Sequence, residues 1–252
     1  MFSQLFHVVL YQPIFNIFVG LYNFIPGHDV GVVILVMTIL IRLLVYPLTN
    51  SSIKAQKSLQ ELQPKMEELK NTYKDDKQKQ SQALMELYKT HKVNPFASCL
   101  PLLVQLPILI ALYMVLRGVL TSQNLADQLY SFIANPVTIN SVSFGFINMA
   151  KANWVLAFLA GAAQYWQAKM TMAKQAPVAA GAGAKDENMM AMMNKQMIYM
   201  MPIMTILIGF SLPAGLTLYW FFSTLLMGLQ QMWLFKKAPA SISVIEGEIV
   251  KK

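Results

Sequence analysis

The feature that most constrains the fold is an apolar run from Val30 to Leu48 whose single charge lies on Arg42. A run of about 20 apolar residues is long enough to cross the hydrocarbon core of a bilayer as a helix. The rest of the chain agrees, since 56% of its residues are hydrophobic and 13% are charged, whereas a soluble domain has about 25% charged residues. The sequence therefore excludes a simple water-soluble globule and predicts an all-α polytopic membrane protein.

Five spans are predicted, and the lysines orient them. Nine lysines lie in loop 50–95, three more lie in loop 170–195, and the tail 236–252 begins with two. Because positive residues collect on the cytoplasmic side, we expect these segments inside, loop 118–152 outside and the N-terminus outside. The predicted spans cover residues 30–49, 96–117, 153–169, 196–212 and 214–235.

The first 26 residues are apolar but lack the basic start and cleavage site of a secretory signal peptide. Their polar residues recur every three to five positions, which is typical of a helix with a narrow polar stripe. The stripe comprises Gln4, His7, Tyr11, Asn16 and Asn23. We expect an amphipathic helix that lies in the extracytoplasmic membrane interface; a spanning anchor is the alternative.

Loop 50–95 has an apolar pattern of its own. Ile53, Leu59, Leu62, Met66 and Leu69 recur at nearly helical spacing between charged residues, and a second stripe begins at Leu84. The polar stretch 74–79 separates the two stripes. We expect a cytoplasmic hairpin of two antiparallel helices, in which Pro64 kinks the first; a solvated, flexible loop is the alternative.

Loop 170–195 begins with a Gly/Ala-rich linker and ends in a cluster of methionines that continues into the fourth span. Flexible thioether side chains accommodate varied apolar partners, so these methionines are candidate contacts for a hydrophobic ligand. Packing within a helix that enters the membrane is an equal alternative, and a copper-thioether site is disfavoured because no His or Cys accompanies the cluster. The candidates are Met193, Met197, Met200 and Met201.

Arg42 is the most informative residue of the spans. It lies about seven residues before Thr49, and therefore about 10 Å from the cytoplasmic end of its span. A charge at such a depth costs several kcal/mol unless it is solvated or paired, yet no Asp or Glu lies in any predicted span. We expect its counter-charge to be water, lipid phosphate or an arriving anion; snorkelling toward the interface is the alternative.

Polar residues from other spans lie at similar predicted depths. Polar side chains in hydrocarbon turn toward protein or a water-filled cavity, so we expect a hydrophilic groove that opens to the cytoplasm and is closed on the outer side. Scattered hydrogen bonds between helices are the alternative. The predicted groove residues are Thr38, Arg42, Gln105, Gln164, Ser223 and Thr224.

The sequence offers little for catalysis. All three histidines lie outside the spans, and neither a metalloprotease helix nor a Gly-rich phosphate loop is present. With Cys99 as the single cysteine, an internal disulfide is excluded. We expect a protein that is not an enzyme and uses no cofactor or metal.

Three motifs in chain order resemble the YidC/Oxa/Alb family of membrane protein insertases. The first is the segment around Arg42 from Thr38 to Thr49. The second runs from Asn94 to Ile108 with Pro101, Gln105 and Pro107, and the third is Gly215-Leu216-Thr217-Leu218-Tyr219-Trp220 with the closing Gln230-Gln231. Because residues 1–29 hold no large domain, the chain is similar to the short forms of that family.

The resemblance implies a five-helix insertase core in the bacterial cytoplasmic membrane. It implies that Arg42 lies in a groove that is open to lipid and to the cytoplasm, where it attracts acidic residues of nascent membrane proteins. It further implies partners for the cytoplasmic loops, namely the ribosome, the signal recognition pathway and the Sec translocon, alongside membrane lipids and no DNA. An anion transporter or channel that uses Arg42, and a passive assembly factor, are the rival functions.

Overall fold

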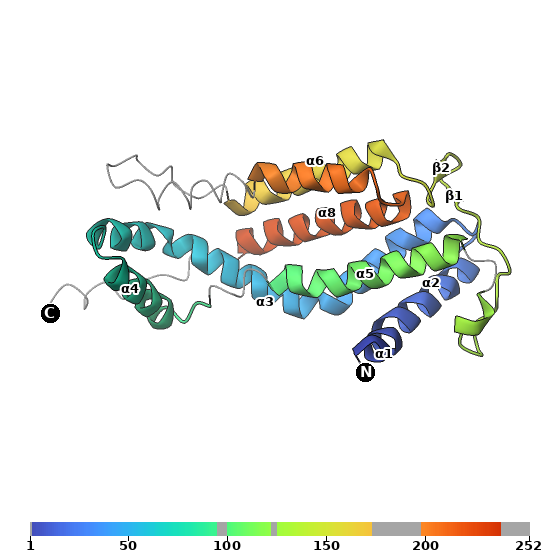
Figure 1. Ribbon diagram of the computed structural model, residues 1–252, viewed down its shortest axis with the longest axis horizontal. Helices are drawn as coiled ribbons and strands as arrows, with labels where there is room; N and C mark the ends of the chain where they lie inside the picture. Colours follow the sequence, from blue (N-terminus) through green and yellow to red (C-terminus); the bar gives the residue numbers. More distant parts are fainter. Residues whose placement is uncertain (1, 95–99, 122–124, 173–197, 238–252) are drawn as a thin grey trace.

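The computed structural model describes residues 2–94, 100–121, 125–172 and 198–237, and most of them are helical (Figure 1). The elements in chain order are α1 (Phe2–Phe6), a π-helical turn η1 (His7–Tyr11), α2 (Gln12–Phe24), α3 (Val30–Thr72), α4 (Lys77–Thr90), α5 (Leu100–Thr121), the 3-10 turn η3 (Ala126–Gln128), β1 (Val142–Ser143), β2 (Ile147–Asn148), α6 (Trp154–Met172), the unlabelled helix Ile198–Gly209 and α8 (Ala214–Lys237). The strands form a two-residue antiparallel ladder that pairs Val142 with Asn148.

The helix that contains Arg42 is longer than the predicted span. It runs for 43 residues through both Pro47 and Pro64, well beyond the predicted span of residues 30–49. A proline removes one backbone hydrogen bond and crowds the preceding turn. The side chains of Thr49 and Ser52 beyond Pro47 are buried, and this tertiary packing holds the helix together across the proline.

α3 and α4 form a helical hairpin at the end of the molecule away from the β-strands (Figure 1). The Gln80 side chain donates to the Lys70 carbonyl at 3.1 Å, and the Tyr88 hydroxyl donates to the Met66 sulfur at 3.7 Å. These contacts lie near the apolar stripes that the sequence predicted. The hairpin and the first span are therefore joined by one uninterrupted helix.

Asp76 caps the second helix of the hairpin. Its carboxylate accepts from the backbone N–H of Lys79 at 3.0 Å and lies 3.2 Å from the Lys79 ammonium. The hydrogen bond from the Lys79 backbone holds the pKa of Asp76 below its usual value. The folded carboxyl thus stays ionised to lower pH than the unfolded one, and its stabilising effect is present above the unfolded pKa and lost as the pH falls through the folded one.

We predict that Asp76→Ala loosens the first turn of α4 at neutral pH, because the orphan N–H groups of the helix lose their acceptor. Hydrogen–deuterium exchange of residues 77–80 should become faster. The matched control is Asp75→Ala, because Asp75 is exposed and precedes the cap. Equal exchange in the two variants would show that Asp76 does not cap α4.

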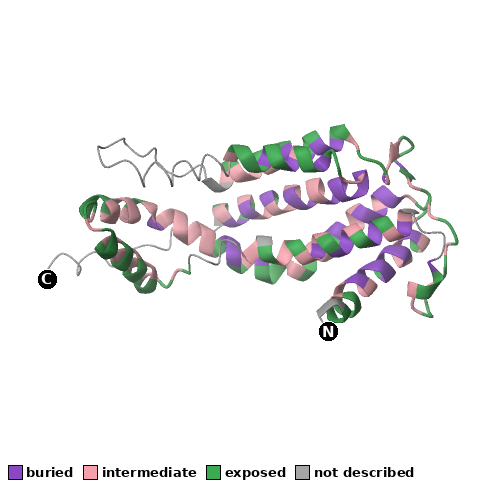
Figure 2. Ribbon diagram, viewed as in Figure 1, coloured by how far each residue is buried: buried purple, intermediate pink, exposed green. Residues whose placement is uncertain are grey.

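The apolar core lies where α2, α3, α5 and α8 face one another, near the β-strand end of the molecule (Figure 2). Phe15 and Phe18 of α2, Ile34 of α3, Leu112 of α5 and Tyr219 of α8 are almost fully buried there. α6 packs along α8, and the helix Ile198–Gly209 packs on α6, where Ile206 lies against Gly161. The bundle therefore positions α3, α5 and α8 side by side.

The polar stripe of the N-terminal helix binds the loop that follows α5. Asn16 donates to the Gln128 carbonyl at 3.0 Å and accepts from the Tyr130 N–H at 2.7 Å, and the Tyr11 hydroxyl donates to the Gln128 side chain. Asn23 donates to the Ala134 carbonyl. The sequence pattern predicted that these residues face the membrane interface. It could not show that a distant loop of the chain binds them.

Three described helices are long and apolar enough to cross a membrane, at Gln4–Phe24, in α3 and at Leu103–Leu120. Their outer faces carry large exposed apolar side chains, such as Leu43 at 64% and Leu44 at 80% exposure, which a protein in water would bury. The all-α polytopic membrane architecture is thus confirmed. Spanning by α6, by Ile198–Gly209 and by α8, and the interfacial placement of residues 1–26, stay predictions.

Candidate functional site

Arg42 projects from α3 onto α8 and is held there by one serine. Its Nε donates to the Ser223 hydroxyl at 3.0 Å, and its Nη2 donates to the same hydroxyl at 2.6 Å and to the Ser223 carbonyl at 2.7 Å. The side chain is partly buried. Neutral oxygen atoms therefore fix its orientation without neutralising its charge.

Some N–H donors of the Arg42 guanidinium have no acceptor among the described residues. It carries five N–H groups, and within the described part of the chain no hydrogen bond to its Nη1 and no salt bridge to a carboxylate is found. Arginine remains protonated in proteins. The site therefore presents a positive charge with open donors that suits a carboxylate or phosphate.

Tyr219 and Gln105 extend this cluster to a third helix. Tyr219 precedes Ser223 by one turn of α8 and accepts at its hydroxyl a hydrogen bond of 2.8 Å from the Gln105 side chain on α5. We call Arg42, Gln105, Tyr219 and Ser223 the arginine cluster. Tyr219 was missed as a site residue, although its position four residues before Ser223 places both on one helix face.

The remaining predicted groove residues lie apart from these contacts. Thr38 is buried, and its hydroxyl donates to the Ile34 carbonyl of its own helix at 2.6 Å. Thr224 is buried on α8, and Gln164 is partly exposed on α6. Two of the predicted groove residues, Arg42 and Ser223, are therefore hydrogen-bonded to each other. A third, Gln105, is hydrogen-bonded to Tyr219 on the same helix as Ser223.

The methionine cluster is described only in part. Met193 and Met197 lie outside the described residues. Met200 and Met201 are 46% and 41% exposed on the helix Ile198–Gly209. Their side chains belong to an apolar outer face that also includes Tyr199, Ile203, Met204 and Leu207.

Further polar contacts follow the arginine cluster along α3 and α8. Thr49 and Gln230 lie seven residues beyond Arg42 and Ser223, and the Gln230 amide donates to the Thr49 hydroxyl at 3.3 Å. The next residue of α8, Gln231, donates from its amide to the side chain of Gln56, seven residues beyond Thr49 on α3, at 3.3 Å. The two helices run in the same direction (Figure 1), so these pairs fix the register that places Ser223 opposite Arg42.

Comparison with known proteins gives consistent matches over most of the chain. The model of the family described as 60Kd inner membrane protein matches residues 16–241. A membrane protein insertase YidC from Fusobacterium nucleatum is 38% identical over 208 residues, which are 82% of this chain and 86% of that protein.

Longer relatives match as well. The membrane protein insertases YidC of Geotalea daltonii and Geobacter sulfurreducens are 33% and 30% identical over 84% and 95% of this chain. The aligned parts are 35% and 39% of those proteins, so the chain spans little more than a third of their length. The match includes the helices that carry the arginine cluster.

Proposed function

Since the chain belongs to the 60Kd inner membrane protein family, we propose that it is a bacterial membrane protein insertase whose arginine cluster receives its clients, the nascent membrane proteins that it inserts. The observation that carries the proposal is Arg42, a charge on an apolar helix that Ser223 orients, while no described residue accepts a hydrogen bond from its Nη1. The insertase activity of relatives that match this chain supports the assignment.

The proposed first step is electrostatic. An acidic residue near the N-terminus of the client approaches from the cytoplasmic side and pairs with the guanidinium. Away from bulk water, two opposite charges attract more strongly than they do in water, and a carboxylate can accept two parallel N–H bonds from the guanidinium. In this way the polar tail of the client crosses part of the membrane while its carboxylate stays hydrogen-bonded to Arg42.

The proposed second step moves the apolar segment of the client into lipid. The helix Ile198–Gly209 presents exposed apolar side chains, and the predicted span of residues 196–212 that includes it has about 17 residues, which is at the low end for a span. Short spans thin the surrounding bilayer and lower the barrier to crossing. Burial of the client's apolar surface, at about 25 cal/mol per Å², would drive release, so no nucleotide is needed.

Delivery is proposed to involve the α3–α4 hairpin, on the cytoplasmic side that its lysines predict. Its charged, largely exposed surface suits docking of the ribosome or of the signal recognition pathway, and the Sec translocon is a further proposed partner. The hydrophilic groove and the placement of the N-terminus outside and the C-terminus inside belong to the same proposal.

Reconstitution tests the function directly. Proteoliposomes that contain the purified chain should protect the translocated tail of a single-span client from an external protease, and empty liposomes should not. The same vesicles should show no uptake of labelled chloride or phosphate. Anion uptake without client insertion would favour the transporter, for which open donors on Arg42 would be an equally suitable site.

A further inference from the structure

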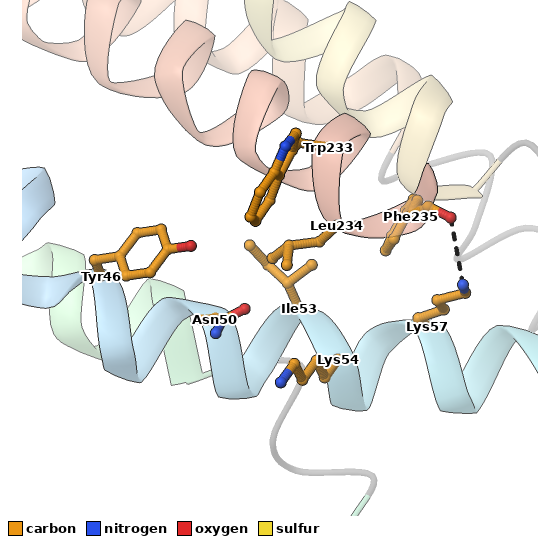
Figure 3. A pocket seen from close by; sticks show the side chains of 8 residues that line it. All are labelled: Tyr46, Asn50, Ile53, Lys54, Lys57, Trp233, Leu234 and Phe235. Carbon is orange, nitrogen blue, oxygen red and sulfur yellow. Dashed lines mark hydrogen bonds between the residues drawn. The ribbon is translucent and has the colours of Figure 1, made fainter. Parts of the chain in front are cut away.

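A second polar feature lies one to four turns beyond Arg42, between α3 and the end of α8. It is a cavity of about 400 Å³. Figure 3 shows that Asn50 and Ile53 enter it from α3 and that Trp233 and Leu234 enter it from α8. The cavity is lined by Tyr46, Asn50, Ile53, Lys54, Lys57, Trp233, Leu234 and Phe235.

Asn50 gives the cavity an unsatisfied acceptor. Its Oδ1 is buried and has no hydrogen-bond partner among the described residues, and it points toward the cavity in Figure 3. A buried acceptor without a donor costs about 1–3 kcal/mol. A ligand that donates a hydrogen bond to Asn50 Oδ1 would therefore be favoured in this cavity.

Two lysines line the cavity, and a carboxylate lies near one of them. Lys57 donates to the Phe235 carbonyl at 3.3 Å and lies 3.9 Å from Glu61. Lys54 is exposed at the rim, and within the described ranges no carboxylate pairs with it. The flexible stem of a lysine lets its ammonium reach a phosphate at the mouth of the cavity.

The remaining lining is apolar and aromatic. The Tyr46 hydroxyl points toward the space between Asn50 and Trp233 (Figure 3). Trp233 is 48% exposed and continues into Leu229, 49% exposed one turn earlier on α8. Tyr and Trp collect where hydrocarbon meets headgroups, and lysines lie just beyond them. Acyl chains would thus lie on α8 below a headgroup in the cavity.

We propose that this cavity binds the headgroup of an anionic glycerophospholipid that carries hydroxyl donors, as phosphatidylglycerol does. The phosphate pairs with Lys54 and the Tyr46 hydroxyl, and a headgroup hydroxyl donates to Asn50 Oδ1. The acyl chains lie against Leu229 and Trp233. The site is separate from the arginine cluster, so lipid binding does not depend on the insertase assignment.

Native mass spectrometry of the detergent-purified full chain tests the proposal. Phosphatidylglycerol should bind several-fold more tightly than phosphatidylcholine with the same acyl chains, which has a phosphate but neither net charge nor a donor. Lys54→Gln and Asn50→Leu should each weaken phosphatidylglycerol binding about tenfold, the loss expected for one hydrogen bond to a charged or buried group. Neither should weaken phosphatidylcholine binding comparably.

Three controls make the result decisive. Lys74→Gln removes an exposed hairpin lysine outside the cavity, and Arg42→Ala removes the client site; both should leave phosphatidylglycerol binding unchanged. Asn50→Leu should melt no lower than the parent in lipid-free detergent, because it removes an unsatisfied acceptor; if it fails to fold, exposed Lys54→Gln decides. Equal affinity for the two lipids, or equal losses in Lys54→Gln and Lys74→Gln, would overturn the proposal.

Discussion

Arg42→Ala should reduce the insertion of clients with acidic translocated tails by roughly tenfold to a hundredfold in proteoliposomes. The magnitude corresponds to the loss of about 1.5–3 kcal/mol for hydrogen bonds to a charged group. Clients whose tails carry no charge should be inserted nearly as well as by the parent, because their transfer into lipid relies on apolar burial. Protease protection of the translocated tail measures both.

Two variants separate the role of the charge from that of the side chain's packing. Arg42→Lys keeps the charge but loses the planar fork of donors, so it should retain partial insertion. Arg117→Ala removes an exposed arginine at the other end of the bundle, on α5, and should have no effect. If Arg42→Ala inserts acidic and neutral tails alike, attraction of a client carboxylate is excluded.

Gly161→Ala should lower the free energy of unfolding by about 1–3 kcal/mol, as for overpacking in a core. A Cβ at this position of α6 would overlap Ile206 Cγ1 and lie 3.1 Å from the Pro202 carbonyl oxygen. The backbone of the helix Ile198–Gly209 would have to move away. Thermal melting of the detergent-purified chain should fall by several degrees.

Gly20→Ala provides the matched control for that variant. In α2 the added Cβ would meet only Ile133 Cδ1, at 3.9 Å, which is ordinary contact. Alanine is a better helix former than glycine by up to about 1 kcal/mol, so this variant should melt at the same temperature or slightly higher. Equal melting of Gly161→Ala and the parent would contradict the close packing of α6 on its neighbour.

The helices were predictable because apolar runs of sufficient length leave a chain few alternatives. The segment expected at residues 153–169 is α6 (Trp154–Met172), and the one expected at 214–235 is α8 (Ala214–Lys237). That α3 continues without a break from the first predicted span into the hairpin was not predicted, because local signals around Pro47 do not reveal the tertiary packing that holds the helix together. Likewise, the polar stripe of residues 4–23 revealed amphipathicity but not the loop that covers it.

The arginine cluster was predictable only in part. The absence of acidic residues from the spans already implied that Arg42 has no carboxylate partner there. Its actual partner depends on the register of α3 against α8, which no local pattern specifies. Thr38 was predicted to line the groove because it is polar, but its hydroxyl donates to the Ile34 carbonyl of its own helix. Tyr219 was overlooked because it lies in an apolar run and is buried in the core, yet its hydroxyl accepts a hydrogen bond from Gln105.

Exchanging the charges of the two proposed partners tests the central claim most directly. Arg42→Glu should fail to insert a client with an acidic tail and should insert the same client once its tail carries lysine, as measured by protease protection in proteoliposomes. The parent should show the reverse preference. If tail charge has the same effect on insertion by both proteins, Arg42 does not receive the client's charge and the proposed mechanism is wrong.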